Sequence, residues 1–210
     1  MRFADRAAAG RALAERLEHL RGADVVVLGI PRGGLPVAAE IARALNAPLD
    51  VVVPRKVGAP RNPELALGAV APGVRVFDER LVRMLQVPEE YLQAEAATQE
   101  REVLRRTETY RAGRPPLDLK GKVAVIVDDG VATGSTVVAA TRWVRSQDPA
   151  RAIIAIPVGP PDARLRLAGE ADEVVFVDTP EPFYAVGQWY ERFDQLTDDE
   201  VIGILQGART

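Results

Sequence analysis

The sequence contains no cysteine and only one histidine among its 210 residues. The missing cysteines exclude disulfide bonds, zinc sites built on thiolates and cysteine nucleophiles. A Ser-His-Asp triad would have to use His19, which lies within a predicted helix. We therefore interpret His19 as a surface or capping residue and assign it no catalytic role.

Long apolar runs and an excess of positive charge are also missing. No stretch approaches the roughly 20 apolar residues of a membrane span, and the N-terminus lacks the apolar core of a signal peptide. The 27 Lys and Arg residues stand against 30 Asp and Glu residues, giving a formal net charge of -3. Because binding to nucleic acid depends on excess cationic side chains, this balance disfavours it. We expect a soluble cytoplasmic protein that does not act at a membrane.

Apolar residues make up 47% of the chain and charged residues 27%. A chain of this length and composition can bury one sizeable core without disulfides or structural metals. We expect a single domain over residues 1–210, with its core at about 22–178 and a C-terminal segment and helix at 179–210.

Short runs of Val, Ile and Ala alternate with segments of helical periodicity over most of the chain. The pattern predicts strands at 24–29, 50–53, 123–127, 152–157 and 173–177, and helices at 3–21, 35–45, 135–146, 161–168 and 198–205. Continuous apolar strands joined by crossover helices indicate a parallel sheet that is buried on both faces. The predicted fold class is α/β, with three layers and a mostly parallel central sheet flanked by helices.

The middle of the chain breaks this alternation. Residues 54–64 are dense in Gly and Pro and predict a loop, two short strands follow at 65–70 and 74–77, and residues 88–111 predict a long charged helix. The arginines in and just after this helix are mixed with glutamates, which favours a solvated helix face over a nucleic-acid contact. These arginines are Arg101, Arg105, Arg106, Arg111 and Arg114.

The strand at 123–127 ends in two adjacent carboxylates, Asp128 and Asp129, and the turn from Gly130 to Thr136 runs directly into a helix. Ligands of open α/β sheets bind beyond the carboxyl ends of the strands, and a glycine-bearing turn at a helix N-terminus offers N–H groups to a phosphate. The two carboxylates could accept hydrogen bonds from vicinal ribose hydroxyls. The segment therefore predicts a site for a ribose 5-phosphate.

Other interpretations of this segment differ in how well the spacing supports them. A Walker A loop requires Gly-Lys-Ser/Thr, which does not occur, and Gly130 and Gly134 lack the spacing of a dinucleotide fingerprint. A hydrolase or phosphatase would need a nucleophile elbow or an Asp-x-Asp strand end, and neither occurs at a predicted strand terminus. An ordinary strand end followed by a helix cap is the alternative that stays open.

A hydrophobic run, two acidic residues and Thr133-Gly134-Ser135-Thr136 together resemble the phosphoribosyl pyrophosphate signature of type I phosphoribosyltransferases. The likeness extends over most of the chain from Val25 onward. It implies that family's fold, with a small hood from the C-terminal aromatic segment. It also implies Mg²⁺-dependent transfer of ribose 5-phosphate from phosphoribosyl pyrophosphate to a nucleobase-like nitrogen acceptor, in nucleotide and nucleoside metabolism. A homodimer is common among such relatives.

The same likeness implies roles for individual residues. Asp128 and Asp129, the candidate catalytic residues, would bind the ribose hydroxyls, and Mg²⁺ would be held mainly by the substrate, with these two carboxylates as candidate ligands. The residues that would bind the 5-phosphate are Ala132, Thr133, Gly134, Ser135 and Thr136. Those that would bind the pyrophosphate are Arg32, Gly33, Gly34, Arg55 and Lys56.

The C-terminal segment 179–195 is rich in aromatic residues, and the family often places a hood there that stacks on the base. Phe183, Tyr184 and Trp189 are the candidate stacking residues, because a flat heterocycle packs well on an aromatic face. A small aromatic core beneath a loop is the alternative interpretation, and the two do not exclude each other.

The acceptor and the catalytic status are left open by the sequence. Ala132 stands where the 6-oxopurine branch of the family has an aspartate, so the resemblance does not imply hypoxanthine or guanine. Glu64 is a candidate for an alternative proton acceptor. The same fold also occurs in regulators that sense nucleotides or phosphoribosyl pyrophosphate, which is the second hypothesis for this chain.

Overall fold

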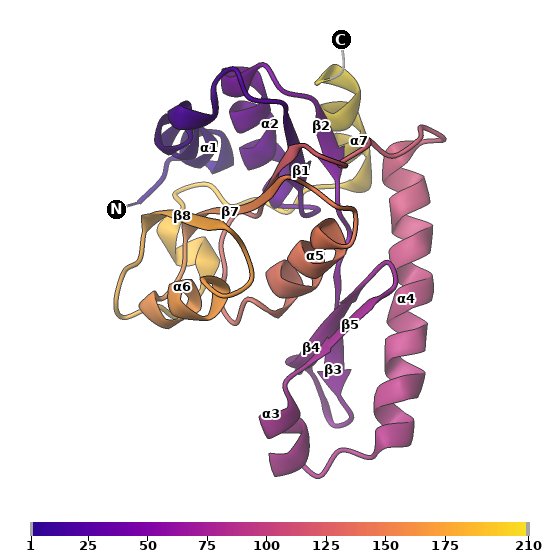
Figure 1. The fold of residues 1–210 in the computed structure, drawn as a ribbon. Helices are drawn as coiled ribbons and strands as arrows, with labels where there is room; N and C mark the ends of the chain where they lie inside the picture. Colours follow the sequence, from indigo (N-terminus) through magenta and orange to yellow (C-terminus); the bar gives the residue numbers. More distant parts are fainter. Residues whose placement is uncertain (1, 209–210) are drawn as a thin grey trace.

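The computed structural model describes residues 2–208 (Figure 1). Its centre is a five-stranded sheet in the order β2-β1-β6-β7-β8, and every neighbouring pair of strands is parallel. These strands are β1 (Val25–Gly29), β2 (Leu49–Val51), β6 (Val123–Val127), β7 (Arg151–Val158) and β8 (Glu173–Asp178). The predicted α/β fold with a parallel central sheet is confirmed.

Helices cover both faces of this sheet. The helices are α1 (Arg6–Arg16), α2 (Gly34–Leu45) and α7 (Asp198–Gly207) on one face, and α5 (Ser135–Arg145) and α6 (Pro161–Leu167) on the other. Within β6, Val125 and Val127 pack in the cluster with the first group, whereas Ala124 and Ile126 pack in the cluster with the second. Because side chains alternate across a strand, continuous apolar strands supply both cores and make a three-layer fold.

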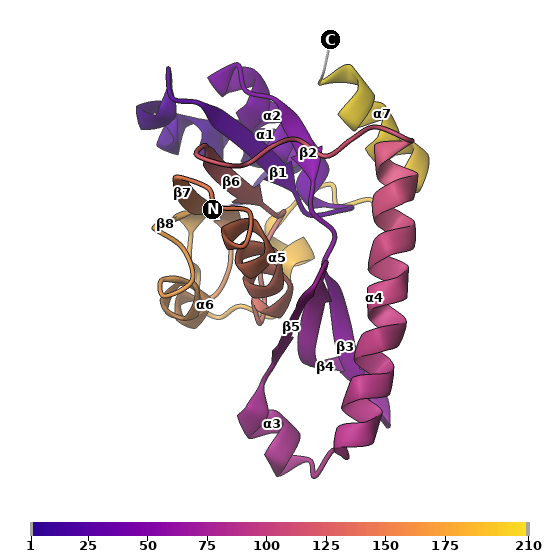
Figure 2. The ribbon, with the colours of Figure 1, turned by 45° about the vertical axis from the view of Figure 1, so that its right-hand side comes forward.

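A second lobe projects from the central sheet (Figures 1 and 2). It consists of an antiparallel sheet of β3 (Arg55–Ala59), β4 (Asn62–Ala71) and β5 (Val74–Phe77), together with α3 (Glu79–Met84) and the long helix α4 (Glu89–Arg111). Val57 and Val70 pack against α4, and Ala69 and Ala71 pack against α5. The lobe is therefore fixed beside the carboxyl end of β6.

The loop predicted for residues 54–64 is wrong, because β3 and the start of β4 lie there and only Pro60 and Arg61 form the turn between them. The pairing of these strands shifts register at Gly58. A Cβ at Gly58 would lie 2.6 Å from the carbonyl oxygen of Pro63. Gly58 is a loop signal in the sequence, but its lack of a side chain instead allows β3 and β4 to approach each other closely where their pairing is irregular.

Helix termini also differ from the prediction. The N-terminal helix begins at Arg6, where Asp5 Oδ1 accepts a hydrogen bond of 2.8 Å from the Ala8 N–H, and it ends at Arg16 before a short 3₁₀ turn at Glu18–Leu20. Helix α3 was not predicted. The last helix was predicted at 198–205, and it begins after a capping box in which the Thr197 and Glu200 side chains accept hydrogen bonds from each other's backbone N–H.

The solvated helix face predicted for the arginines of α4 is wrong for Arg111. Its Nε lies 3.4 Å from Oδ1 of Asp50, a carboxylate on β2 that is 1% exposed, and the N–H of Leu117 donates to Oδ2 at 2.9 Å. Arg105 and Arg106 instead pair with Glu102 on their own helix. The C-terminal end of α4 is thus fastened to the central sheet by a buried carboxylate.

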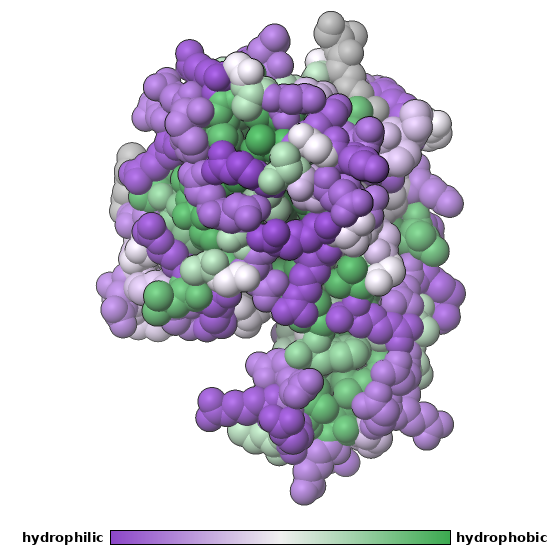
Figure 3. Space-filling view, viewed as in Figure 1, coloured by the Kyte–Doolittle hydropathy of each residue, from purple (hydrophilic) through white to green (hydrophobic). Residues whose placement is uncertain are grey.

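The surface of the molecule is mostly hydrophilic in the view of Figure 3, with apolar side chains visible on the projecting lobe. Over residues 2–208, none of the helices combines the length and the apolarity that a bilayer crossing requires. His19 is half-exposed, and its Nε2 lies 3.1 Å from Glu173 Oε1 at the surface.

Candidate functional site

A cavity of about 880 Å³ lies beyond the carboxyl end of β6. The turn from Gly130 to Thr136 forms one wall, and the projecting lobe forms another with Lys56, Glu64 and Asp78. Phe183 and Tyr184 line it from the C-terminal segment. This volume falls within the range of about 300–1,000 Å³ that is typical of small-molecule sites.

The turn that begins α5 leaves backbone N–H groups and hydroxyls at the cavity. Gly134 has a φ of 85°, a left-handed conformation that glycine adopts without strain. Within the described part of the chain, no side chain caps this helix, so its first N–H groups stay free for a ligand. The hydroxyls of Thr133 and Ser135 lie 3.4 Å apart beside these N–H groups. The five residues predicted to bind the 5-phosphate all line the cavity.

Asp128 faces this cavity at the end of β6. Burial raises the pKa of its carboxyl well above the ordinary value, and the adjacent Asp129 raises it further, whereas the Lys56 ammonium acts in the opposite direction. Its Oδ1 accepts a hydrogen bond of 2.9 Å from the N–H of Asp129. Asp128 is therefore a half-buried carboxylate at the cavity that lacks full charge compensation and that a ligand with hydroxyl or cationic groups would stabilise.

Asp129 is directed away from the cavity and toward the N-terminal helix. Its Oδ2 lies 2.8 Å from Arg6 Nε, and the two side chains are 13% and 12% exposed. Arg6 also donates to the carbonyl of Asp194 at 2.8 Å and lies 4.0 Å from the ring centre of Phe193. Burial raises the pKa of Asp129, and the hydrogen bond from Arg6 opposes that shift. The two adjacent carboxylates thus have different partners.

The residues Arg32, Gly33 and Gly34, predicted to bind pyrophosphate, pack directly on the end of β6 and are not among the residues that line the cavity. A Cβ at Gly33 would overlap Asp129 Oδ2, and a Cβ at Gly34 would lie 2.5 Å from the carbonyl oxygen of Val127. The Pro31–Arg32 peptide is cis. Only glycines allow this segment to lie so close to the two carboxylates.

The cationic side chains predicted for pyrophosphate point in different directions. Lys56 lines the cavity, whereas Arg32 lies 3.8 Å from Asp198 Oδ1 and the Arg55 Nε donates to Gln99 Oε1 at 3.0 Å. Burial, followed by repulsion from Arg106, lowers the pKa of Arg55. Successive residues of a strand point to opposite faces, which is why Arg55 and Lys56 do not share the cavity.

The three candidate stacking residues are also divided. Phe183 and Tyr184 line the cavity, and Tyr184 is 81% exposed. Trp189 instead packs in a small aromatic core with Phe3 and Tyr190, at 6.2 Å from the ring of Phe183, and its Nε1 is buried without an acceptor among residues 2–208. The segment therefore supplies both a small core and two rings at the cavity.

Sequence reasoning missed several polar residues near the site. Arg142 and Arg166 line the cavity, paired with Glu170 at 2.8 Å and with Asp162 respectively, and Arg166 Nη2 donates to the carbonyl of Ala132 at 3.3 Å. In the sequence, an arginine that lies in a helix and pairs with an acidic residue looks like any other charged surface residue. No motif therefore identified Arg142 or Arg166. Arg6 carried no signal either, because 123 positions separate it from Asp129.

No three His, Asp or Glu side chains in the described range converge into a metal cage. At the end of β6 the cavity offers the Asp128 carboxylate, together with the hydroxyls of the turn. Carboxylate and water oxygens are the ligands that Mg²⁺ prefers. The donor set suits a Mg²⁺ ion carried largely by a polyphosphate ligand, and the predicted cofactor stays a prediction.

Comparisons with known proteins find matches that cover nearly the whole chain. The family model of the phosphoribosyl transferase domain matches residues 4–200. Two curated proteins of Mycobacterium tuberculosis, strains H37Rv and CDC 1551, carry the name "Putative phosphoribosyl transferase" and are 50% identical to this chain over 207 residues. The match covers 98% of this chain and 47% of theirs, so the chain spans about half the length of these curated relatives.

Two solved structures share the fold. The protein TT1426 of Thermus thermophilus is 47% identical, with a TM-score of 0.83 and 99% of each chain covered. A hypothetical protein of Neisseria gonorrhoeae with bound ppGpp is 16% identical, with a TM-score of 0.53 over 100% of this chain and 99% of that one. At that low identity, the second likeness concerns the fold alone.

Proposed function

This chain belongs to the phosphoribosyl transferase family, and on that premise we propose that it transfers ribose 5-phosphate from phosphoribosyl pyrophosphate to a nucleobase-like nitrogen acceptor. The observation that carries the proposal is the position of Asp128. In one cavity this carboxylate faces both the uncapped turn at residues 132–136 and the ammonium of Lys56. A sugar flanked by a 5-phosphate and a pyrophosphate requires that arrangement of groups.

The 5-phosphate binds at the N-terminus of α5. The N–H groups of the turn and the hydroxyls of Thr133, Ser135 and Thr136 donate to its oxygens, and the positive end of the helix dipole favours its charge. Arg166, which already donates to the carbonyl of Ala132, supports the turn from α6.

The ribose hydroxyls donate to Asp128. The sequence assigned this role to both adjacent carboxylates, but Asp129 has Arg6 as its partner in the structure. We propose that Asp128 contacts the sugar and that Asp129, locked between Arg6 and Gly33, holds the end of β6 in place.

The pyrophosphate lies between the Arg32–Gly34 backbone and Lys56. The two glycines pack against Asp129 and the end of β6, which places their backbone beside Asp128, and Lys56 supplies positive charge from the cavity wall. Arg32 and Arg55 would join only by leaving Asp198 and Gln99. Asp128 would hold a Mg²⁺ ion or its water ligands, and such an ion would supply positive charge to the pyrophosphate.

The reaction forms a bond between the acceptor nitrogen and the anomeric carbon while the bond from that carbon to the pyrophosphate oxygen breaks. The electron pair of the broken bond leaves with pyrophosphate. Positive charge develops on the ribose ring, and the Asp128 carboxylate stabilises it electrostatically. The rest of the catalysis is positioning, because the wall of the projecting lobe holds the acceptor against the sugar.

The acceptor contacts Glu64 on the projecting lobe and Phe183 and Tyr184 on the C-terminal segment. Two aromatic rings suit a flat heterocycle, and Glu64 is an exposed carboxylate on the cavity wall that can take the proton from the acceptor nitrogen. Ala132 supplies no carboxylate of its own at the turn. These features favour an acceptor whose N–H group donates a hydrogen bond to the Glu64 carboxylate.

The second candidate function is a non-catalytic sensor of phosphoribosyl pyrophosphate or nucleotides. It is favoured by Ala132, which leaves the turn without a proton-handling side chain. The phosphate and sugar contacts would be the same in a sensor. The two candidates differ only in turnover.

The test is pyrophosphate release from phosphoribosyl pyrophosphate and Mg²⁺ with a panel of purine and pyrimidine bases. We expect one class of base to support release, and we expect Asp128→Asn to abolish it. Asp24→Asn is the matched control, since Asp24 is exposed at the amino end of β1, away from the cavity. Binding of phosphoribosyl pyrophosphate without pyrophosphate release with any base would favour the sensor. Absence of phosphoribosyl pyrophosphate binding would contradict both functions.

A further inference from the structure

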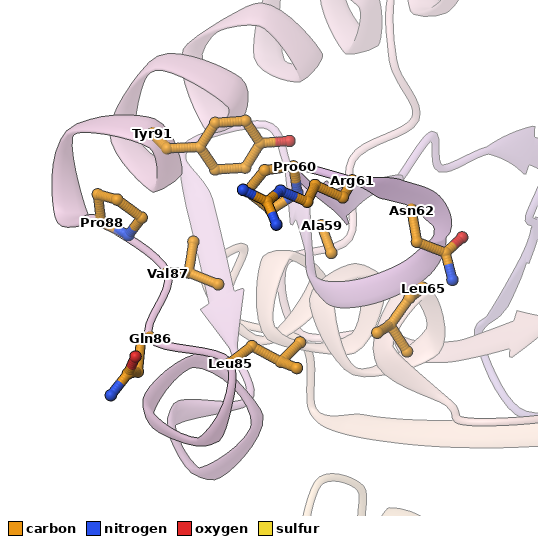
Figure 4. Close-up of a pocket in the computed structure, with 10 residues that line it drawn as sticks. All are labelled: Ala59, Pro60, Arg61, Asn62, Leu65, Leu85, Gln86, Val87, Pro88 and Tyr91. Atoms are coloured by element: carbon orange, nitrogen blue, oxygen red, sulfur yellow. The ribbon is translucent and has the colours of Figure 1, made fainter.

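A second pocket, of about 650 Å³, lies in the projecting lobe (Figure 4). It is bounded by the turn between β3 and β4, by the end of α3 and by the start of α4. Leu65 lies on the wall that this pocket shares with the larger cavity. No step of the proposed reaction uses this space, and its size is typical of a small-molecule site.

The walls of this pocket are mainly apolar. Pro60, Leu65, Leu85 and Val87 line it, and Leu65 and Leu85 are 37% and 42% exposed. The ring of Tyr91 forms a further wall, and its hydroxyl donates to the carbonyl of Gly58 at 2.9 Å, which holds the ring in position. Large apolar side chains that stay exposed around a hollow favour an apolar occupant.

One charged group points into this apolar space. Figure 4 shows the Arg61 side chain extending from the turn toward Tyr91 and Val87, with Leu85 on the far side. Among residues 2–208, no carboxylate pairs with Arg61, whereas Arg75 and Arg83 of the same lobe pair with Glu100 at 2.7 Å and Glu79 at 3.4 Å. A guanidinium so placed offers several N–H donors in a fixed geometry to an incoming anion.

We propose that this pocket binds a small organic anion, with its carboxylate or sulfonate paired with Arg61 and its apolar body packed on Leu65, Leu85, Val87 and Tyr91. The charge complementarity comes from the unpaired guanidinium, and the affinity for the body comes from burial of apolar surface. Asn62 and Gln86 lie at the rim as further hydrogen-bonding groups. The occupant would contact β4 through Leu65, next to Glu64 on the wall of the larger cavity. The site does not depend on the reaction proposed above.

The probe for the test is 8-anilinonaphthalene-1-sulfonate, an aromatic sulfonate whose fluorescence rises in apolar surroundings, with octanoate as a competing aliphatic carboxylate. Wild type is compared with Arg61→Gln, which removes the charge, and with Leu85→Trp, which fills the pocket. Arg83→Gln is the matched control, because Arg83 is an exposed arginine of the same lobe that lines neither cavity. Circular dichroism verifies that each variant is folded.

We expect one saturable probe site per chain, displaced by octanoate, with the dissociation constant raised at least about ten-fold in Arg61→Gln because a charge-assisted hydrogen bond is lost. Leu85→Trp should lose the site, and Arg83→Gln and Asp128→Asn should keep it. Equal affinity in Arg61→Gln and wild type would overturn the proposal. So would the absence of saturable binding to the folded protein, or loss of the probe site in Asp128→Asn, which would place the probe in the larger cavity.

Discussion

Arg6 Nε and Asp129 Oδ2 lie 2.8 Å apart, and this ion pair joins the first helix to the carboxyl end of β6 across 123 positions of sequence. The pair lies against Gly33, and the Tyr190 hydroxyl donates to the carbonyl of Asp129. Through its carboxylate and its backbone carbonyl, Asp129 thus connects the N-terminal helix, the 31–34 segment and the aromatic C-terminal segment. Its neighbour Asp128 stays directed at the cavity.

The Arg6–Asp129 pair should contribute to stability more than a surface pair does. Arg6→Gln leaves a largely buried carboxylate without its partner, and we expect the free energy of unfolding to fall by about 2–3 kcal/mol. Arg11→Gln is the control, because Arg11 is 61% exposed and 4.0 Å from Glu40, and its loss should cost less than about 0.5 kcal/mol. Urea unfolding of both variants provides the comparison, and equal losses would show that the buried pair has no special role.

Asp128 should make stability fall as pH rises. Its folded-state pKa is raised by burial and by Asp129, against the opposing charges of Lys56 and Arg6, so the folded state binds more protons than the unfolded state. Stability therefore declines as pH rises from the ordinary aspartate pKa of about 4 through the raised value. We expect Asp128→Asn to reduce this decline and to have the higher melting temperature at pH 7, while losing ligand affinity. A melting temperature at pH 7 below that of wild type would contradict this account of the carboxylate.

Asp50 is expected to be the strongest structural carboxylate outside the site. It is 1% exposed and accepts hydrogen bonds from the Leu117 N–H and from Arg111. Asp50→Ala leaves those donors buried and unpaired, so the free energy of unfolding should fall by about 3–5 kcal/mol. Asp24→Ala, at an exposed position, should change it by less than about 0.5 kcal/mol. Denaturant titration measures both, and a loss under about 1 kcal/mol in Asp50→Ala would refute the assignment.

Gly33 should be intolerant of any side chain. An alanine there drives its Cβ into Asp129 Oδ2, so the ion pair with Arg6 or the 31–34 segment must move. We expect a loss of about 1–3 kcal/mol in stability together with weaker binding of phosphoribosyl pyrophosphate. Gly169→Ala is the control, because a Cβ there meets no atom of the described chain within 4 Å. If the two variants had equal melting temperatures and affinities, the close packing at Gly33 would have no consequence.

The central sheet and the glycine-bearing turn before α5 were predictable from the sequence because both are local patterns. Runs such as Val123–Val127 can only be buried on both faces, and the turn before Ser135 carries its own glycine and hydroxyls. The strand at Arg55–Ala59 was missed because Gly58 and Pro60 are loop signals. Strand pairing there is decided by contacts with β4, which local composition does not contain.

The different orientations and partners of the two adjacent carboxylates could not be predicted. Asp128 and Asp129 are identical in type, and the distant Arg6 pairs with Asp129 while Asp128 faces the cavity. The same reasoning explains Arg55, whose partner Gln99 lies 44 positions away on α4. Interactions between residues that are far apart in the sequence produce no characteristic spacing, so a sequence pattern cannot reveal them.

The most direct test of the central claim is calorimetric titration of phosphoribosyl pyrophosphate with Mg²⁺ into wild type, Asp128→Asn and the control Asp24→Asn. The account predicts binding of one molecule per chain to wild type and to the control, with the dissociation constant raised at least about ten-fold in Asp128→Asn. Equal affinity in all three proteins, or no binding to wild type, would contradict it.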